Sequence, residues 1–147
     1  MILYILNGPN LNMLGIREPG IYGNESYDTL VKMMDEHCKA LGITPVIYQS
    51  NHEGDLVDKI QEAYFNNASG IVINPGAYTH TSIALLDALK ATRLPAVEVH
   101  ISAVDEREDF RKISYIRAAC LKTISGHGTR GYIEAIDFLA KEVKNES

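Results

Sequence analysis

The sequence predicts an α/β fold: a three-layer sandwich in which a five-stranded parallel sheet carries helices on both faces. Short apolar runs bounded by Gly, Pro and Asn alternate with stripes of apolar residues three and four positions apart, which are typical of strands and helices respectively. This alternation favours parallel strands joined by helical crossovers, with the flavodoxin-like strand order 2-1-3-4-5. The length of 147 residues fits a single catalytic domain, residues 1–147.

The first half of the chain predicts two strands and two helices, with one long loop. Segment 7–24 is dense in Gly, Pro and Asn, and structureless loops longer than about 12–15 residues are usually functional or disordered. Ser26 or Asn24 can cap the first helix, and Gly42 can end it. In order, the elements are a strand at 2–6, the helix with stripe positions 30–41, a strand at 43–49 and a helix with stripe positions 56–64.

The second half continues the alternation. Residues 70–73 are apolar throughout, as in a fully buried strand, and end at Asn74-Pro75-Gly76, where Pro lacks an amide donor and Gly permits positive φ. Thr79 or Thr81 can cap the next helix. Its apolar stripe is predicted to hold Ile83, Leu85, Leu86 and Leu89. Further elements are a strand at 95–101, a charged loop or short helical turn at 102–111, a fifth strand or a helical turn plus strand at 115–125, and a final helix at 132–143.

Composition limits the classes of function. The hydrophobic content of 46% with 22% charged residues is ordinary for a soluble globular protein. A net charge of −5 argues against nucleic acid or an anionic membrane as partner, although local arginines could still bind an anionic substrate. There is no basic leader and no apolar run of about 20 residues, so we expect a cytoplasmic protein without a membrane span. We expect Cys38 and Cys120 to be buried free thiols, with a disulfide as the weaker alternative.

Polar residues gather where the predicted strands end. Asn74, Tyr78, His80 and Ser82 follow the strand at 70–73. In a parallel sheet, ligands bind at the carboxyl edge near the switch point, which here lies between the first and third strands. A structural loop needs Gly, Pro and one cap, so the extra amide and imidazole indicate a ligand site.

Glu98 and His100 are two positions apart on one strand, so they project from the same face. A carboxylate that orients an imidazole is a common arrangement for acid–base chemistry. A histidine that is merely hydrogen-bonded at a strand end explains the pair equally well. A metal site of His80, Glu98 and His100 is a third, weaker interpretation.

Two arginines, Arg17 and Arg111, are expected near this edge. Their position beside His and Asn residues favours binding of a carboxylate-bearing substrate over the alternative that they are solvated surface residues. Tyr22 could act as a base only if its pKa fell from about 10 to about 7, which requires roughly 4 kcal/mol in favour of the phenolate. A nearby arginine is the source of that energy visible in the sequence.

The segment GHGTRG at residues 126–131 matches the dinucleotide pattern G-x-G-x-x-G. Only 16 residues follow it, which is too few for the required βαβ unit. Glycines that turn the chain and pack a helix closely explain the segment better.

Three segments resemble the signatures of the type II 3-dehydroquinate dehydratase family, in the family's order. They are NGPNLNMLGIREPGIYG at 7–23, INPGAYTHTS at 73–82 and EVHIS at 98–102. The resemblance implies a hydro-lyase without cofactor or metal that converts 3-dehydroquinate to 3-dehydroshikimate by anti elimination through an enol or enolate. This reaction serves the shikimate pathway to chorismate and the aromatic amino acids, or quinate breakdown. The resemblance also implies a dodecamer of four trimers.

The same resemblance implies residue roles. Tyr22 would remove the α-proton, with Arg17 lowering its pKa, and Asn10 would position a water against the enolate oxygen. His100 would protonate the departing hydroxyl, oriented by Glu98. The implied substrate-binding residues are Asn74, His80, Ile101, Ser102, Arg111 and Asp87, the last completing a neighbouring subunit's site. The chain departs from the family pattern at Leu86, Ala103 and Asp105, and in the run 120–123.

Two other classes of protein remain as alternatives. A flavodoxin-like module for a phosphate or nucleotide wants a phosphate-binding loop directly after the first strand, where Pro9 removes one amide donor. A metallohydrolase would use His80 and His100. The strand-end motifs contain no lysine, which argues against Schiff-base chemistry.

Overall fold

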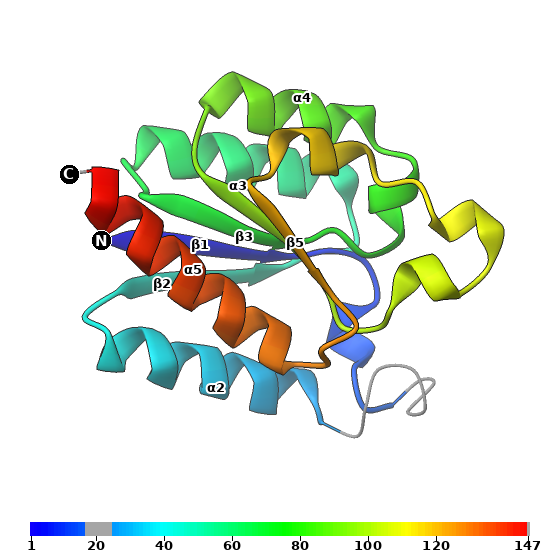
Figure 1. Cartoon of the computed structure of the whole chain (residues 1–147), viewed down its shortest axis with the longest axis horizontal. Coiled ribbons are helices and arrows are strands. Elements are labelled where there is room, and N and C mark those ends of the chain that lie inside the picture. The colour runs from blue at the N-terminus through cyan, green and yellow to red at the C-terminus, as the bar shows by residue number, and fades with distance from the viewer. Residues whose placement is uncertain (17–24, 147) are drawn as a thin grey trace.

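The computed structural model describes residues 1–16 and 25–146. Five parallel strands form one sheet in the order β2-β1-β3-β4-β5, which confirms the predicted topology. Helices α3 and α4 cover one face and α2 and α5 cover the other (Figure 1). The elements are β1 Ile2–Asn7, α2 Tyr27–Ala40, β2 Thr44–Gln49, α3 Glu53–Phe65, β3 Gly70–Asn74, α4 Ile83–Thr92, β4 Ala96–His100, β5 Lys122–Ser125 and α5 Arg130–Glu146.

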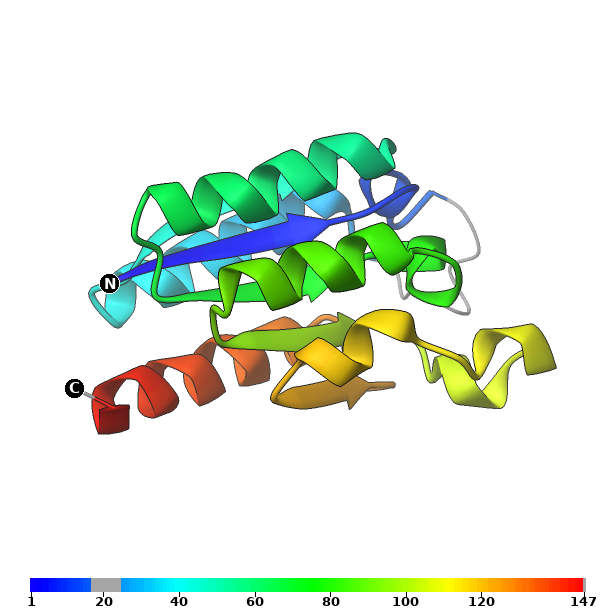
Figure 2. The same ribbon diagram turned by 90° about the horizontal axis from the view of Figure 1, so that it is seen from above.

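The sheet has one hydrophobic core on each face, because successive side chains of the central strands point to opposite faces. In β1, Leu3 and Ile5 pack with α2 and α5, whereas Tyr4 and Leu6 pack with α3 and α4. All four side chains are at most 1% exposed, because a parallel sheet is buried on both faces. In Figure 2 the strands run toward the side where the segments after β3 and β4 gather, and both termini lie at the other side.

The two cysteines belong to different layers. Cys38 is buried in the core under α2, whereas Cys120 packs against the core under α3 and α4 and is only partly buried. Both are free thiols, so the prediction of no disulfide is confirmed, but burial of both was wrong for Cys120. Burial raises the pKa of Cys38 to about 11 and that of Cys120 to about 12, which keeps both thiols protonated at neutral pH.

The start of α4 differs from the prediction. The N-cap is Ser82, whose Oγ accepts from the amide of Leu85 at 3.0 Å, and not Thr79 or Thr81. The chain first makes a 3₁₀ turn at Gly76–His80, which delays the helix. Its buried face holds Leu85, Ala88, Leu89 and Thr92, so the predicted inward positions of Ile83 (56% exposed) and Leu86 (half-buried) were wrong. Both sets of residues have helical spacing, and docking on the sheet selects between them.

The region before α5 follows the second of the two predicted alternatives. A 3₁₀ turn at Tyr115–Ala119 precedes β5, and the amide of Leu121 donates to the carbonyl of Ala96 at 2.8 Å. Gly126 and Gly128 have φ of 82° and 62°, and a Cβ at Gly131 would lie 3.3 Å from Ile124. These glycines turn the chain and pack a helix closely, so the structural interpretation of GHGTRG is confirmed.

No helix within the described ranges is long and apolar enough to cross a membrane.

Candidate active site

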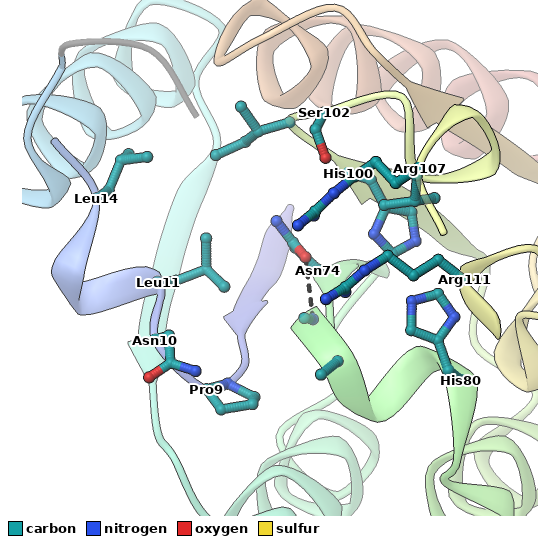
Figure 3. Close-up of a pocket in the computed structure, with 14 residues that line it drawn as sticks. Pro9, Asn10, Leu11, Leu14, Asn74, His80, His100, Ser102, Arg107 and Arg111 are labelled. Atoms are coloured by element: carbon teal, nitrogen blue, oxygen red, sulfur yellow. Dashed lines mark hydrogen bonds between the residues drawn. The ribbon is translucent and has the colours of Figure 1, made fainter. Parts of the chain in front are cut away.

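A cavity of about 170 Å³ opens at the carboxyl edge of the sheet, between the segments that follow β1, β3 and β4 (Figure 3). Drug-sized ligands occupy pockets of roughly 300–1,000 Å³, so this cavity suits a small metabolite better than a dinucleotide. Its walls include seven of the residues singled out from sequence: Asn10, Asn74, His80, His100, Ile101, Ser102 and Arg111. Leu11, Leu14 and Val104 add an apolar wall.

Four predicted residues that the structure describes are not in that wall: Tyr78, Ser82, Asp87 and Glu98. Glu98 is fully buried behind His100. Asp87 is exposed on α4 and does not line the cavity. Arg17 and Tyr22 lie outside the described residues.

Glu98 and His100 form a buried pair, as their spacing on one strand predicted. Nε2 of His100 lies 2.5 Å from Oε2 of Glu98, and the two side chains are 4% and 0% exposed. His100 itself lines the cavity. Because Nε2 faces the carboxylate, Nδ1 is the nitrogen left to exchange a proton with a bound molecule.

The Glu98 carboxylate is surrounded by donors. Burial alone would raise the pKa of Glu98, but hydrogen bonds from His100, Arg117 and Ser114 outweigh it and lower the pKa to about 2. The carboxylate is therefore ionised at neutral pH. Its further donors are the hydroxyls of Thr79 and Thr123, at 3.3 and 3.1 Å.

Asn74, at the end of β3, is fixed by a buried chain of hydrogen bonds. Its Nδ2 donates to the Tyr132 hydroxyl at 2.9 Å, and its Oδ1 accepts from the amide of Gly76 at 3.1 Å. The Tyr132 hydroxyl in turn donates to Oδ1 of Asn7 at 2.7 Å. Burial raises the pKa of Tyr132, so its hydroxyl remains a donor. The remaining hydrogen-bonding capacity of the Asn74 amide is thereby directed at the cavity.

The loop after β1 interlocks with the turn after β3. The amide of Gly8 donates to the carbonyl of Asn74 at 2.8 Å, and the amide of Asn10 donates to Oδ1 of Asn51 at 3.0 Å. Asn10 has a φ of 71°, a left-handed conformation that asparagine tolerates better than most residues. Since Gly8 and Asn10 already use their amides and Pro9 has none, residues 8–10 offer a phosphate no free backbone donor.

Three cationic or imidazole groups complete the cavity. His80 places Nδ1 2.6 Å from the carbonyl of Ile113, so Nδ1 carries the proton and Nε2 can accept one. Arg107 and Arg111 both line the cavity and extend into it beside Asn74 (Figure 3). Sequence reasoning missed Arg107, although it stands in the same charged run as Arg111. Separate 3₁₀ turns at Val104–Glu106 and Asp109–Arg111 bring the two together, and their spacing alone gave no such signal.

The part of the chain that the structure describes contains no group of three or more His, Cys, Asp or Glu side chains arranged to hold a metal ion. The two histidines proposed as ligands each direct one nitrogen to a protein partner: His80 to a backbone carbonyl and His100 to a carboxylate.

Comparisons with known proteins agree on one family. The family described as Dehydroquinase class II matches residues 1–140. A 3-dehydroquinate dehydratase of Caldicellulosiruptor bescii is 50% identical over 139 residues, which cover 95% of each chain. The crystal structure of a type II dehydroquinase from Butyrivibrio crossotus superimposes with a TM-score of 0.93 at 58% identity, over 95% of this chain and 97% of that one. The type II dehydroquinase of Propionibacterium acnes gives a TM-score of 0.91 at 39% identity, over 95% and 96%.

Proposed function

The chain belongs to the class II dehydroquinase family, and we propose that it removes water from 3-dehydroquinate to give 3-dehydroshikimate, in the shikimate pathway. The observation that carries this proposal is the buried, ionised Glu98 held against His100, which lines a small cavity. An elimination next to a ketone needs a base, a partner for the enolate oxygen and an acid for the leaving group. Membership of the family and the chemistry of this edge supply candidates for all three.

In the proposed reaction, Tyr22 as phenolate takes a proton from the carbon next to the ketone, with Arg17 stabilising its charge. The electron pair moves onto the ketone oxygen, and a water held by Asn10 stabilises the enolate. The pair then returns to form the carbon–carbon double bond as the hydroxyl leaves. His100 donates its proton to that hydroxyl through Nδ1, so that water departs.

Substrate recognition is proposed to divide between polar and cationic groups. The Asn74 amide, His80, the backbone at Ile101 and Ser102 would bind hydroxyls and the carboxylate of the substrate. Arg111 would supply positive charge for the carboxylate, and the position of Arg107 in the same wall supports a shared role. No metal or cofactor is required by this mechanism.

Assembly, location and domain organisation are part of the same proposal. Asp87 is exposed on α4 and apart from the cavity of its own chain, which supports a role in a neighbouring subunit's site within a dodecamer of four trimers. A cytoplasmic location is supported by the two free thiols, which suit a reducing compartment. We also propose that residues 1–147 act as one catalytic domain.

The first prediction is turnover of 3-dehydroquinate by the purified protein, followed by the ultraviolet absorbance of the conjugated product. We expect Tyr22→Phe to lose at least about 100-fold in kcat, the lower end of what a positioned base contributes. Chelator should leave the rate unchanged. Tyr64→Phe, at a half-exposed position on α3, is the matched control and should keep full activity.

The outcomes separate the parts of the proposal. No turnover by folded, assembled wild-type protein would refute the dehydratase. Turnover that survives in Tyr22→Phe would keep the reaction and refute the base. Loss of activity with chelator, restored by a divalent metal, would favour a metal site at His80 and His100 and refute the metal-free mechanism.

A further inference from the structure

We propose that Arg117 is a positioning residue for the acid step. It holds the Glu98 carboxylate in one orientation and offsets part of its negative charge, so that His100 can release its proton to the leaving hydroxyl. The expected effect on catalysis rests on the proposed function. The orientation of the carboxylate by Arg117 rests only on the contacts of Glu98.

Arg117 reaches both carboxylate oxygens of Glu98. Its Nε donates to Oε1 at 3.1 Å and its terminal NH₂ donates to Oε2 at 3.3 Å. Two parallel bonds from a planar guanidinium fix the plane of the carboxylate, which a single donor cannot do. Oε2 is also the atom that accepts from His100, so the orientation set by Arg117 is passed to the imidazole.

The guanidinium contacts Glu98 without lining the cavity. Arg117 belongs to the 3₁₀ turn Tyr115–Ala119, which packs beside α4 (Figure 1), and it does not line the cavity. The Glu98 side chain is 0% exposed, and a buried carboxylate is stable only when charge or hydrogen bonds compensate for lost hydration. The hydroxyls of Thr79, Ser114 and Thr123 donate to the carboxylate but bring no charge. Arg117 brings a full positive charge.

The charged and titratable groups around the pair come from each neighbouring segment of the described chain. The turn after β3 contributes His80, and the loop after β4 contributes Arg107 and Arg111 at the cavity. The segment before β5 contributes Cys120, whose thiol is protonated at neutral pH because burial raises its pKa to about 12. The arginines of the loop line the cavity, whereas Arg117 contacts the carboxylate directly.

The sign of the effect follows from charge. A lone carboxylate beside His100 would stabilise the positive charge of the protonated imidazole and so oppose release of the Nδ1 proton. The positive charge of Arg117 on the same carboxylate weakens this attraction. Arg117 therefore favours proton release, and its removal should make the Glu98–His100 pair retain the proton to higher pH.

The test compares Arg117→Gln and Arg117→Lys with wild type, in the full-length assembled enzyme. For Arg117→Gln we expect kcat to fall about 10-fold, a part of the 10²- to 10⁴-fold that a positioned acid contributes, with KM changed less than about 2-fold. The alkaline limb of the pH profile should move up by about one pH unit. Arg117→Lys restores the charge without the two-point contact, so it should restore the limb but only part of kcat. Arg93→Gln, an exposed arginine at the far end of α4, is the matched control.

A second readout needs no substrate. NMR of histidine labelled at Cε1, with the His100 signal identified by His100→Gln, follows protonation of the imidazole directly. We expect the midpoint for His100 to rise in Arg117→Gln and to return in Arg117→Lys. An unmoved midpoint and an unmoved alkaline limb in folded Arg117→Gln would overturn the inference, even if kcat fell. Absence of turnover by wild type would refute the proposed function instead, and the NMR midpoint would still decide the role of Arg117.

Discussion

The carboxylate of Glu98 is fully buried and ionised at neutral pH, so its charge affects the stability of the fold. Its pKa is lowered from 4.5 to about 2, so its contribution is complete above pH 4.5 and is lost as the pH falls toward 2. The difference of about 2.5 pH units corresponds to roughly 3 kcal/mol. The hydrogen bonds that orient the acid therefore also stabilise the fold at neutral pH.

We predict that Glu98→Gln lowers the free energy of unfolding at pH 7 by roughly 3 kcal/mol, and that this deficit shrinks as the pH falls from about 4.5 to 2. Denaturant titrations at several pH values and one protein concentration would measure it. Glu134→Gln, a half-exposed carboxylate on α5, is the control and should change stability little at any pH. A deficit for Glu98→Gln that is independent of pH would contradict the assigned charge.

At the scale of elements, the contact between two loops shapes the cavity. A Cβ at Gly8 would lie 2.3 Å from the carbonyl oxygen of Pro75, a distance that real Cβ atoms do not adopt. Only glycine lets the end of β1 approach the turn after β3 this closely. The approach brings Asn10 and Asn74 to the same cavity.

We predict that Gly8→Ala destabilises the protein by about 1–3 kcal/mol, because the loops must separate, and that it also raises KM. Gly54→Ala is the matched control: nothing lies within 4 Å of its would-be Cβ, and the residue is inside α3. There alanine should stabilise by up to about 1 kcal/mol, since it reduces the freedom of the unfolded chain. Equal effects of the two substitutions on the thermal midpoint and on KM would mean that the loop contact is not tight.

At the scale of the whole molecule, the proposal that Asp87 serves a neighbouring site can be tested by mixing subunits. We predict that Asp87→Ala and Tyr22→Phe are each nearly inactive, and that co-expression restores activity. In a randomly mixed assembly roughly one quarter of sites would receive Tyr22 from one chain and Asp87 from another.

Co-expression of the two variants with different affinity tags, followed by purification on both tags so that only mixed assemblies are assayed, would supply the measurement. The double variant Tyr22→Phe/Asp87→Ala co-expressed with Asp87→Ala is the control, because no site in that mixture can hold both side chains. Mixed assemblies without restored activity would place Asp87 outside the neighbouring site.

Sequence reasoning predicted the fold well because its signals are local. Periods of two and of three to four, interrupted by Asn, Pro and Gly, identified each strand and the edge where polar residues gather. The errors concerned the choice between neighbouring residues that suit the same structural position. Ser82 rather than Thr79 or Thr81 caps α4, and Ile83, which was predicted to share a stripe with Leu85, is exposed while Leu85 is buried.

The sequence alone predicts the alternation of strands and helices, the family and the polar residues at the ends of β3 and β4, because these depend on short-range pattern and motif. The groups that support those polar residues are known only from the packed fold. Arg117 is hydrogen-bonded to Glu98, which is 19 positions away in the sequence. Tyr132 is hydrogen-bonded to Asn74 and Asn7, which are 58 and 125 positions away. No periodicity encodes such pairs, since each depends on the packing of separate elements around one sheet, and the charge state of a buried carboxylate depends in turn on those pairs.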